Sequence, residues 1–348
     1  MISKNIKYYR LLKFMRKKEL ADAVNVTPMA ISNYESGKRI PEMDILKRIA
    51  NVLGVRISDF LVIRNKDIKF RHNEFRKCSS LTKEKQELIY EIIEEYFNRF
   101  MDSVEILGGN VLPNPPICHE LKITLDPEED ALSLRNHLGF ASYGPIDDLI
   151  RNLENKGILV LMYEIDDEKF SGINGFVNEY PYIMLNKKMP SERNRSTIAH
   201  ELAHLMFNWK ETNLSKKEIE NYATAIGGAF LFSKKDAIRE LGIHRRFISK
   251  DMILVAIEYG ISMMLLAKRA ELLNIVTVSS AKEFYILASK LGWRKNEPSR
   301  IGKIEKPMLF EQLVYRAINE NEINLQRGAE LLKMPYNEVA ENCFFDGK

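Results

Sequence analysis

Residues 196–207 read STIAHELAHLMF, and this stretch decides how the middle of the chain is interpreted. Its apolar residues recur at the spacing of one helix face: Ile198, Leu202, Leu205 and Met206. His200 and His204 lie about 200° round from that stripe, so both project from the opposite face. Their spacing lets two imidazoles converge on one ion, with Glu201 beside them to reach a bound water. Taken alone, the motif also fits an ordinary core helix that carries two polar residues.

A second predicted helix, at residues 215–232, offers a third ligand, and two glutamates compete for the role. Ser215 and Glu218 stand in the Ser-x-x-Glu relation of a capping box, which gives Glu218 a structural task at the helix start. Glu220 has no such task, and small residues after it, among them Gly227, would let the two helices approach closely. Three protein ligands with a fourth position open to water are typical of a catalytic zinc site. The predicted Zn²⁺ ligands are His200, His204 and Glu220.

A basic excess lies at the N-terminus. The 348 residues carry a net charge of +4, but residues 1–66 hold 14 Lys and Arg against 6 Asp and Glu. A concentrated excess of this kind attracts a phosphate backbone. Within it, ELADAVNVTPMAISNYESGKR (residues 19–39) predicts a helix-turn-helix: one helix ends near Val24, Thr27 caps the next, and Pro28 takes its first position.

The exposed residues of the second helix of this unit, and of the loop after it, are the expected contacts to double-stranded DNA. They are Thr27, Pro28, Met29, Ser32, Asn33, Lys38 and Arg39. In such a unit the N-terminal residues of the second helix reach base edges, while basic and hydroxyl groups hold phosphates. Asn33 is suited to adenine, whereas Met29 offers only apolar contact. The alternative is a helical domain that binds other proteins. In that case the basic residues are exposed to solvent and have no role in DNA binding.

Two family resemblances follow from these motifs. The run IS-x-x-E-x-GKR-x-P from Ile31 to Pro41, with ILKRIANVLGV after it, resembles the XRE family of helix-turn-helix domains. The strand YIMLN, the run RSTIAHELAHLMF and the pattern E-x-x-A-x-x-x-G-x-A-F-L from Glu220 to Leu231 resemble the ImmA/IrrE metallopeptidases. This second resemblance covers residues 140–240, and members of that family are frequently fused to an XRE domain in this order.

The resemblance implies gluzincin-like zinc chemistry. Zn²⁺ would be held by His200, His204 and Glu220, and Glu201 would take a proton from the bound water and pass it to the leaving amine. In several members the substrate is a helix-turn-helix repressor that is cut at a particular site. XRE proteins commonly bind palindromic operators as dimers, which implies a homodimer on double-stranded DNA. Thr224 stands where Asn or Asp is usual, and we expect weaker support of the ligands there.

A peptide substrate is expected to lie extended against the strand at residues 183–186 and to add one strand to its edge. The expected substrate-binding residues are Ile183, Met184, Leu185 and Asn186. Tyr222 and His244 are candidate hydrogen-bond donors to the oxyanion that forms when a peptide bond is hydrolysed. Core packing of Tyr222 and solvation of His244 are the simpler interpretations, so both stay outside the catalytic set.

The expected fold is α+β and mostly α. Residues 1–66 form an all-helical XRE-type DNA-binding domain, and residues 67–139 a linker and a long helix that fits either a strut or a dimer seam. Residues 140–240 form a gluzincin-like zinc peptidase core with a small antiparallel sheet, and residues 241–348 a helical C-terminal domain. The absence of a long apolar run or a secretory leader, together with three scattered cysteines, predicts a cytoplasmic protein with no membrane partner.

These features predict a DNA-binding transcriptional regulator with a zinc-dependent endopeptidase that cleaves a repressor protein, either itself or a partner. The alternative is a non-proteolytic XRE-type transcription factor or antitoxin that uses the zinc fold for partner binding. The two hypotheses diverge on Glu201, because an endopeptidase loses activity without this residue and a binding module tolerates its loss.

Overall fold

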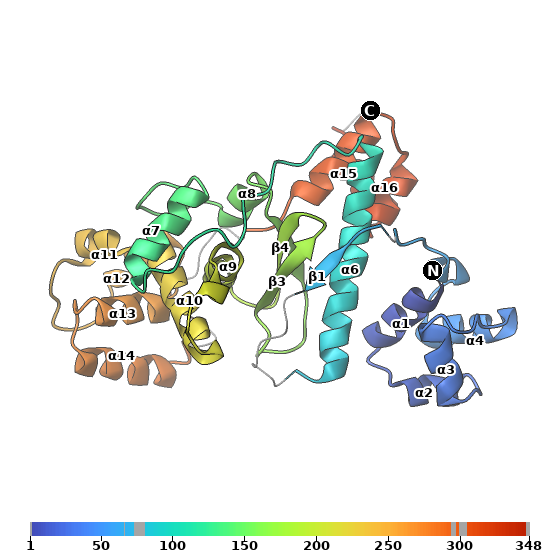
Figure 1. Cartoon of the computed structure of the whole chain (residues 1–348), viewed down its shortest axis with the longest axis horizontal. Coiled ribbons are helices and arrows are strands. Elements are labelled where there is room, and N and C mark those ends of the chain that lie inside the picture. The colour runs from blue at the N-terminus through green and yellow to red at the C-terminus, as the bar shows by residue number, and fades with distance from the viewer. Residues whose placement is uncertain (1, 66, 73–80, 294–296, 299–304, 346–348) are drawn as a thin grey trace. The chain divides into compact units, whose positions relative to one another are not determined.

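The chain divides into two compact units, whose helices and strands are drawn in Figure 1. A computed structural model describes all residues except 1, 66, 73–80, 294–296, 299–304 and 346–348. The first unit comprises Met1–Asn110 and Leu313–Lys348, and the second comprises Val111–Gln312. These units cut across the four segments expected from the sequence. Among the described residues, no helix is long and apolar enough to cross a membrane.

The N-terminal part of the first unit is helical, as predicted. Its helices are α1 (Ile2–Leu12), α2 (Lys17–Ala23), α3 (Pro28–Glu35), α4 (Met43–Leu53) and α5 (Ile57–Phe60). They pack around an apolar core that includes Leu20 and Ile31. Arg10 on α1 and Glu35 at the end of α3 are both buried and form a two-pronged ion pair, with Arg10 Nη2 donating to Glu35 Oε2 at 3.0 Å. Because a buried charge needs a partner, this pair fixes α3 against α1.

The rest of the first unit is built on one long helix. Its elements are the short strand β1 (Phe70–His72), α6 (Lys83–Ile106), α16 (Leu325–Leu332) and α17 (Tyr336–Cys343), while α15 (Leu309–Asn319) spans the boundary between the units in sequence. Helix α6 packs on α1 and on α16. Its apolar face, which includes Ile92, Ile93 and Phe97, is buried within the chain. This face therefore belongs to the core of the chain itself.

Three strands of the second unit lie side by side in the order β3-β4-β2. They are β2 (Leu159–Tyr163), β3 (Gly172–Val177) and β4 (Tyr180–Asn186). The strands β3 and β4 form an antiparallel hairpin, whereas β2 pairs with β4 in parallel. The sheet is therefore mixed, which corrects the antiparallel sheet expected from the sequence. The connection of residues 164–171 carries the chain from the end of β2 back to the hairpin.

The position of β4 also corrects the expected substrate strand. Both neighbours of β4 are paired with it, so it has no free edge to which a peptide can add. Ile183, Met184, Leu185 and Asn186 are all 0% exposed. The Asn186 side chain instead closes the loop after β2, because its Nδ2 donates to the Ile165 carbonyl at 3.0 Å and its Oδ1 accepts the Ile165 N–H at 3.1 Å. The prediction that these four residues bind substrate is therefore wrong.

The helices of the second unit, including the motif helix α9, contribute to one apolar core with the sheet. They are α7 (Pro127–His137), α8 (Leu149–Glu154), α9 (Ser191–Met206), the short 3₁₀ helix η1 (Trp209–Glu211), α10 (Lys216–Leu231), α11 (Lys234–Leu241), α12 (Met252–Tyr259), α13 (Met263–Leu272) and α14 (Val278–Lys290). Helix α9 contacts β3 and β4 on one side and α10 on another (Figure 1). Its apolar stripe, with Ile198, Leu202 and Leu205 at 0% exposure, is buried in the core.

The helices α9 and α10 approach each other closely at Gly227. A Cβ atom at this position would lie 3.0 Å from the backbone N of His200 and 3.1 Å from the backbone carbon of Ala199. Both atoms belong to a helix that the sheet contacts from another side, so they have little room to move. The small residue expected at this contact is therefore what brings the two helices together.

Replacing Gly227 with alanine should destabilise the second unit by about 1–3 kcal/mol, because the added carbon displaces the backbone of α9. Gly228→Ala is the matched control: its Cβ would meet only a side-chain atom, Arg269 Cδ at 3.3 Å, and no backbone of another helix. Alanine at that position should gain up to about 1 kcal/mol of helix propensity. Hydrogen–deuterium exchange of α9 peptides in the full chain measures both effects. Equal protection of α9 in the two variants would contradict the tight contact.

Candidate metal centre and nucleic-acid interface

Three side chains of the kinds that bind metal ions lie close together between α9 and α10. His204 Nε2 lies 3.2 Å from His200 Nε2, and Glu220 Oε2 lies 3.3 Å from His200 Nε2 and 3.8 Å from His204 Nε2. Donor atoms around a tetrahedral zinc ion, with bonds of about 2.0–2.1 Å, stand about 3.3–3.4 Å apart. The three distances are close to this value, and two imidazoles with one carboxylate are ordinary zinc donors. The residues therefore fit a zinc ion.

The cluster is closed on one side and open on the other. The His204 side chain is 1% exposed, whereas the side chains of His200 and Glu220 are 21% and 37% exposed. The Trp209 ring lies 5.4 Å from the His204 ring, and its Nε1 donates to the Ala203 carbonyl at 3.0 Å. The cluster is therefore accessible from solvent on the side of His200 and Glu220.

Thr224 determines which nitrogen of His200 faces the cluster. The Thr224 hydroxyl donates its single proton to the Glu220 backbone carbonyl at 2.8 Å, one turn earlier on α10. The same oxygen lies 3.1 Å from His200 Nδ1, so there it accepts, and Nδ1 carries the proton. Nε2 then presents its lone pair to the cluster. Thr224 thus supplies a hydrogen-bond partner for His200 at the position where the resemblance leads one to expect Asn or Asp.

Glu201 is held by a residue that the sequence analysis missed. Asn174 on β3 is 1% exposed, and its Nδ2 donates to Glu201 Oε2. Glu201 itself is 9% exposed and lies between the two histidines in the sequence of α9. The hydrogen bond fixes the Glu201 carboxylate relative to the sheet. The sequence contains one indication of this role, because Asn174 is a polar residue inside the otherwise apolar strand GINGFV.

The two candidate oxyanion donors have other partners or surroundings. The Tyr222 hydroxyl donates to Asp130 Oδ2 at 2.7 Å and so ties α10 to α7. Burial and the contact with the Asp130 carboxylate raise the pKa of Tyr222 well above its usual range. His244 lies exposed in the segment between α11 and α12. Both residues therefore remain outside the catalytic set.

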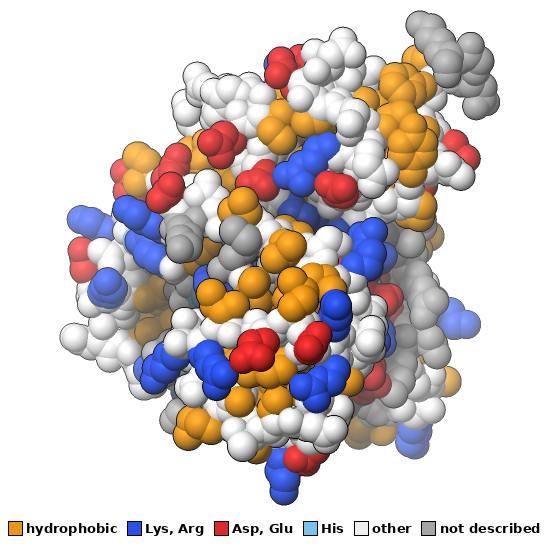
Figure 2. Space-filling model, turned by 90° about the vertical axis from the view of Figure 1, so that its right-hand side faces the viewer, with side chains coloured by type: hydrophobic (Ala, Val, Ile, Leu, Met, Phe, Trp, Pro, Cys, Tyr) orange, Lys and Arg blue, Asp and Glu red, His pale blue; other side chains and the backbone are white. Residues whose placement is uncertain are grey.

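The helix-turn-helix has the expected local structure. Thr27 Oγ1 accepts the Ala30 N–H at 3.1 Å, and Pro28 occupies the first turn of α3. Met29 is 68% exposed, Ser32 and Asn33 are half-buried, and Lys38 and Arg39 are exposed. Figure 2 shows Lys and Arg side chains interspersed with apolar side chains on the face that it draws, so basic groups do not form one continuous patch there.

Comparison with known families finds two matches in the chain. Residues 6–60 match the helix-turn-helix family, and residues 153–271 match the IrrE N-terminal-like domain, which is a peptidase family. The chain joins a helix-turn-helix domain to an IrrE-like peptidase domain. This fusion confirms the resemblance seen in the sequence. The match to the peptidase family includes α9, α10 and α13, and the IrrE-like family is generally zinc-dependent.

Curated relatives match short stretches of this chain. Multiprotein-bridging factor 1 of Candida albicans is 38% identical over 56 residues, which are 16% of this chain and 37% of that protein. The endothelial differentiation-related factor 1 homolog of Xenopus laevis is 36% identical over 67 residues, 19% of this chain and 42% of that protein. The chain therefore matches less than half the length of either relative.

Two solved structures align with the chain at low similarity. They are Bacillus thuringiensis PlcR in complex with the peptide PapR7 and DNA, and the apo form of ComR from S. thermophilus, each 16% identical. The alignments cover 100% of this chain and 99% of PlcR, and 98% of this chain and 95% of ComR. The TM-scores are 0.18 and 0.17, too low to carry a conclusion about the fold.

Thr224→Val should lower zinc affinity about 10- to 100-fold, because His200 loses the acceptor that orients it. Thr224→Ser keeps the hydroxyl and should bind zinc nearly as well as the wild-type chain. Competition with a chromophoric chelator measures both affinities on the full chain. If the valine variant held zinc as tightly as the serine variant, the hydroxyl would have no part in orienting His200.

Proposed function

We propose that this chain is a DNA-binding transcriptional regulator whose zinc-dependent endopeptidase cleaves a repressor protein, either itself or a partner. The observation that carries the proposal is the three-ligand cluster, open on one side, with a carboxylate held next to it. A structural zinc site would be closed by four protein ligands, whereas His200, His204 and Glu220 leave a position for water and substrate.

The residues around the cluster have separate roles in the proposed peptide hydrolysis. Zinc, when bound, supplies a Lewis acid that lowers the pKa of a coordinated water and polarises a peptide carbonyl. Glu201 takes a proton from the attacking water and passes it to the leaving amine. Asn174 occupies one oxygen of the Glu201 carboxylate and leaves the other oxygen to carry that proton. His200, oriented by Thr224, keeps its Nε2 toward the metal throughout.

The helix-turn-helix domain gives the protein its genomic target. The exposed start of α3 and the basic residues after it provide one base-reading group and several phosphate-holding groups, in the arrangement that DNA-binding units of this type use. We infer that Asn33 reads a base edge and that Lys38 and Arg39 hold phosphates of a double-stranded operator. Binding to a palindromic operator would require a homodimer.

Glu201→Gln should retain zinc and lose proteolysis, since removal of a general base typically costs about 10²- to 10⁴-fold in rate. Glu218→Gln is the matched control, because Glu218 is exposed and only accepts the Ser215 N–H at the start of α10, at 2.8 Å. Mass spectrometry of new protein N-termini in the producing cell compares the two variants with the wild-type chain. Termini present with the control and absent with Glu201→Gln would identify the target.

Identical profiles of N-termini for all three chains, each loaded with zinc, would contradict the peptidase. The protein would then be a transcription factor or antitoxin that uses the zinc fold to bind a partner.

Asn33→Ala should weaken binding to the preferred DNA sequence by about 1–3 kcal/mol and relax the sequence preference at one position. Lys38→Ala should weaken binding to all sequences alike and reduce the salt dependence by about one phosphate contact. Selection from a random duplex library by the full chain supplies the operator, and titrations at several salt concentrations measure both variants. An unchanged sequence preference in the Asn33 variant would remove this residue from the interface.

A further inference from the structure

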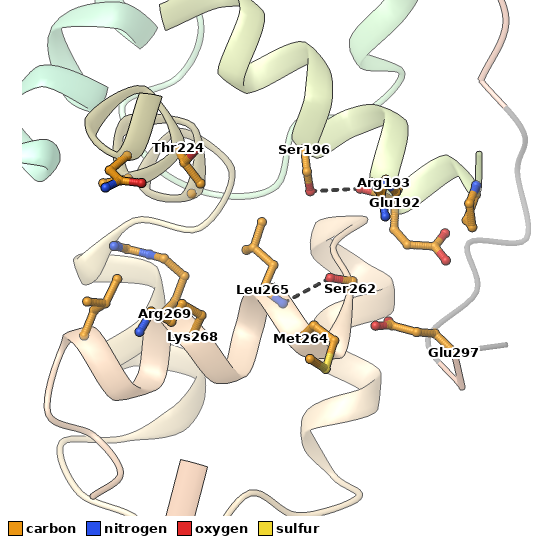
Figure 3. Close-up of a pocket in the computed structure, with 15 residues that line it drawn as sticks. Glu192, Arg193, Ser196, Thr224, Ser262, Met264, Leu265, Lys268, Arg269 and Glu297 are labelled. Atoms are coloured by element: carbon orange, nitrogen blue, oxygen red, sulfur yellow. Dashed lines mark hydrogen bonds between the residues drawn. The ribbon is translucent and has the colours of Figure 1, made fainter. Parts of the chain in front are cut away.

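A cavity of about 850 Å³ lies beside the metal cluster, within the second unit. Residues of α9, α10 and α13 line it (Figure 3). Three of its lining residues adjoin the cluster: Thr224 contacts His200, Ser196 stands one turn before His200 on α9, and Asn221 follows Glu220. The three candidate ligands do not line the cavity themselves, and the cavity lies next to the His200 side of the cluster and extends along α9 toward the start of that helix.

Glu192 lies at the far end of this cavity and is 4% exposed. Figure 3 shows its carboxyl group extending away from α9 toward Ser262 and Glu297. No described residue makes a hydrogen bond or an ion pair with this carboxyl group. An acidic residue at a helix start needs no burial to interact with the helix dipole. A carboxyl group that is buried without a partner costs free energy, which a ligand with a positive group would offset.

None of the three basic residues that line the cavity, Arg193, Lys268 and Arg269, forms an ion pair with Glu192. Arg269 donates to Glu128, and Lys268 pairs with Glu271 at 3.2 Å. Figure 3 places both of them at the other end of the cavity, below Thr224. Two basic residues with acidic partners thus lie at the Thr224 end of the cavity, while the far end holds the carboxylates of Glu192 and Glu297 beside the exposed Arg193.

The acidic end and the middle of the cavity fit a long basic side chain. Glu297 adds a second carboxylate there and accepts the Met263 N–H at 2.8 Å. Leu265 and Met264 lie between the two ends in Figure 3. The aliphatic stem of a lysine or arginine packs well on such apolar groups while its charged head meets a carboxylate.

We propose that the cavity receives an extended peptide on one side of the scissile bond, and that Glu192 selects a lysine or arginine in it. This inference rests on the proposed peptidase function. Glu192 precedes His200 by eight residues, about 12 Å along the helix, and an extended peptide covers that distance in about three or four residues. The selected basic residue therefore stands three or four positions from the bond that is cut.

The test uses a library of unstructured, randomised synthetic decapeptides and the zinc-loaded full chain. In a cleavage arm, mass spectrometry reads the sequences around each cut bond. In a binding arm, the immobilised Glu201→Gln chain retains peptides without cutting them, and the retained peptides are sequenced. Both arms are repeated with Glu192→Gln, which conserves size, and with Glu218→Gln as the control. The zinc content of each variant is measured to show that the fold is kept.

The expected result is enrichment of lysine and arginine at the third or fourth position from the cut. Glu192→Gln should reduce this preference about tenfold or more, and Glu218→Gln should leave it unchanged. Cleavage that depends on Glu201 but shows no basic preference, or a preference that Glu192→Gln leaves intact, would overturn the inference and leave the peptidase standing.

Two further outcomes separate the inference from the proposed function. Retention of basic peptides that depends on Glu192, without any cleavage, would support the cavity as a peptide site and overturn the peptidase. If the chain neither retained nor cut any peptide, both the inference and the peptidase would fail.

Discussion

The contact between α10 and α9 at Gly227 sets the separation on which the metal centre depends. Two ligands come from α9 and the third from α10, and their donor atoms must stand about 3.3–3.4 Å apart to share one zinc ion. A Cβ atom at Gly227 would meet the His200 backbone at 3.0 Å, so any larger residue there moves the two helices apart. Glu220 lies two turns before this glycine on the same helix, and a displacement of α10 would carry its carboxylate away from the histidines.

Around this contact, each functional group is oriented by a different element. The Thr224 hydroxyl on α10 holds His200, the Asn174 amide on β3 holds Glu201, and Trp209 covers His204. Such supporting hydrogen bonds keep a site within the narrow geometry that catalysis needs. The sheet therefore helps to position Glu201, because β3 presents Asn174 to the motif helix.

Local periodicity was enough to predict the helix-turn-helix and the clustering of His200, His204 and Glu220. The apolar stripes indicate which side of each helix is buried, and the polar residues of both helices then project away from these stripes. Pairing between distant segments was not predictable in the same way. A run such as YIMLN indicates a buried strand but not which neighbours it has, so the parallel pairing of β2 with β4 was missed. The bond from Asn174 to Glu201 was missed for the same reason.

In the proposed function, the polar side of α9 connects the site of peptide cleavage with the site that recognises a basic side chain. Glu192, Ser196, His200 and His204 follow one another at intervals of four residues, on the side of the helix away from the buried apolar stripe. Four residues exceed one helical turn slightly, so this row winds slowly round the helix and stays continuous over about 18 Å. Its C-terminal half carries metal ligands, and its N-terminal half lines the cavity. In the proposed function, a peptide that follows the row would meet the candidate zinc ligands and the Glu192 carboxyl group in succession, so one rigid helix would set the distance between the bond that is cut and the residue that is recognised.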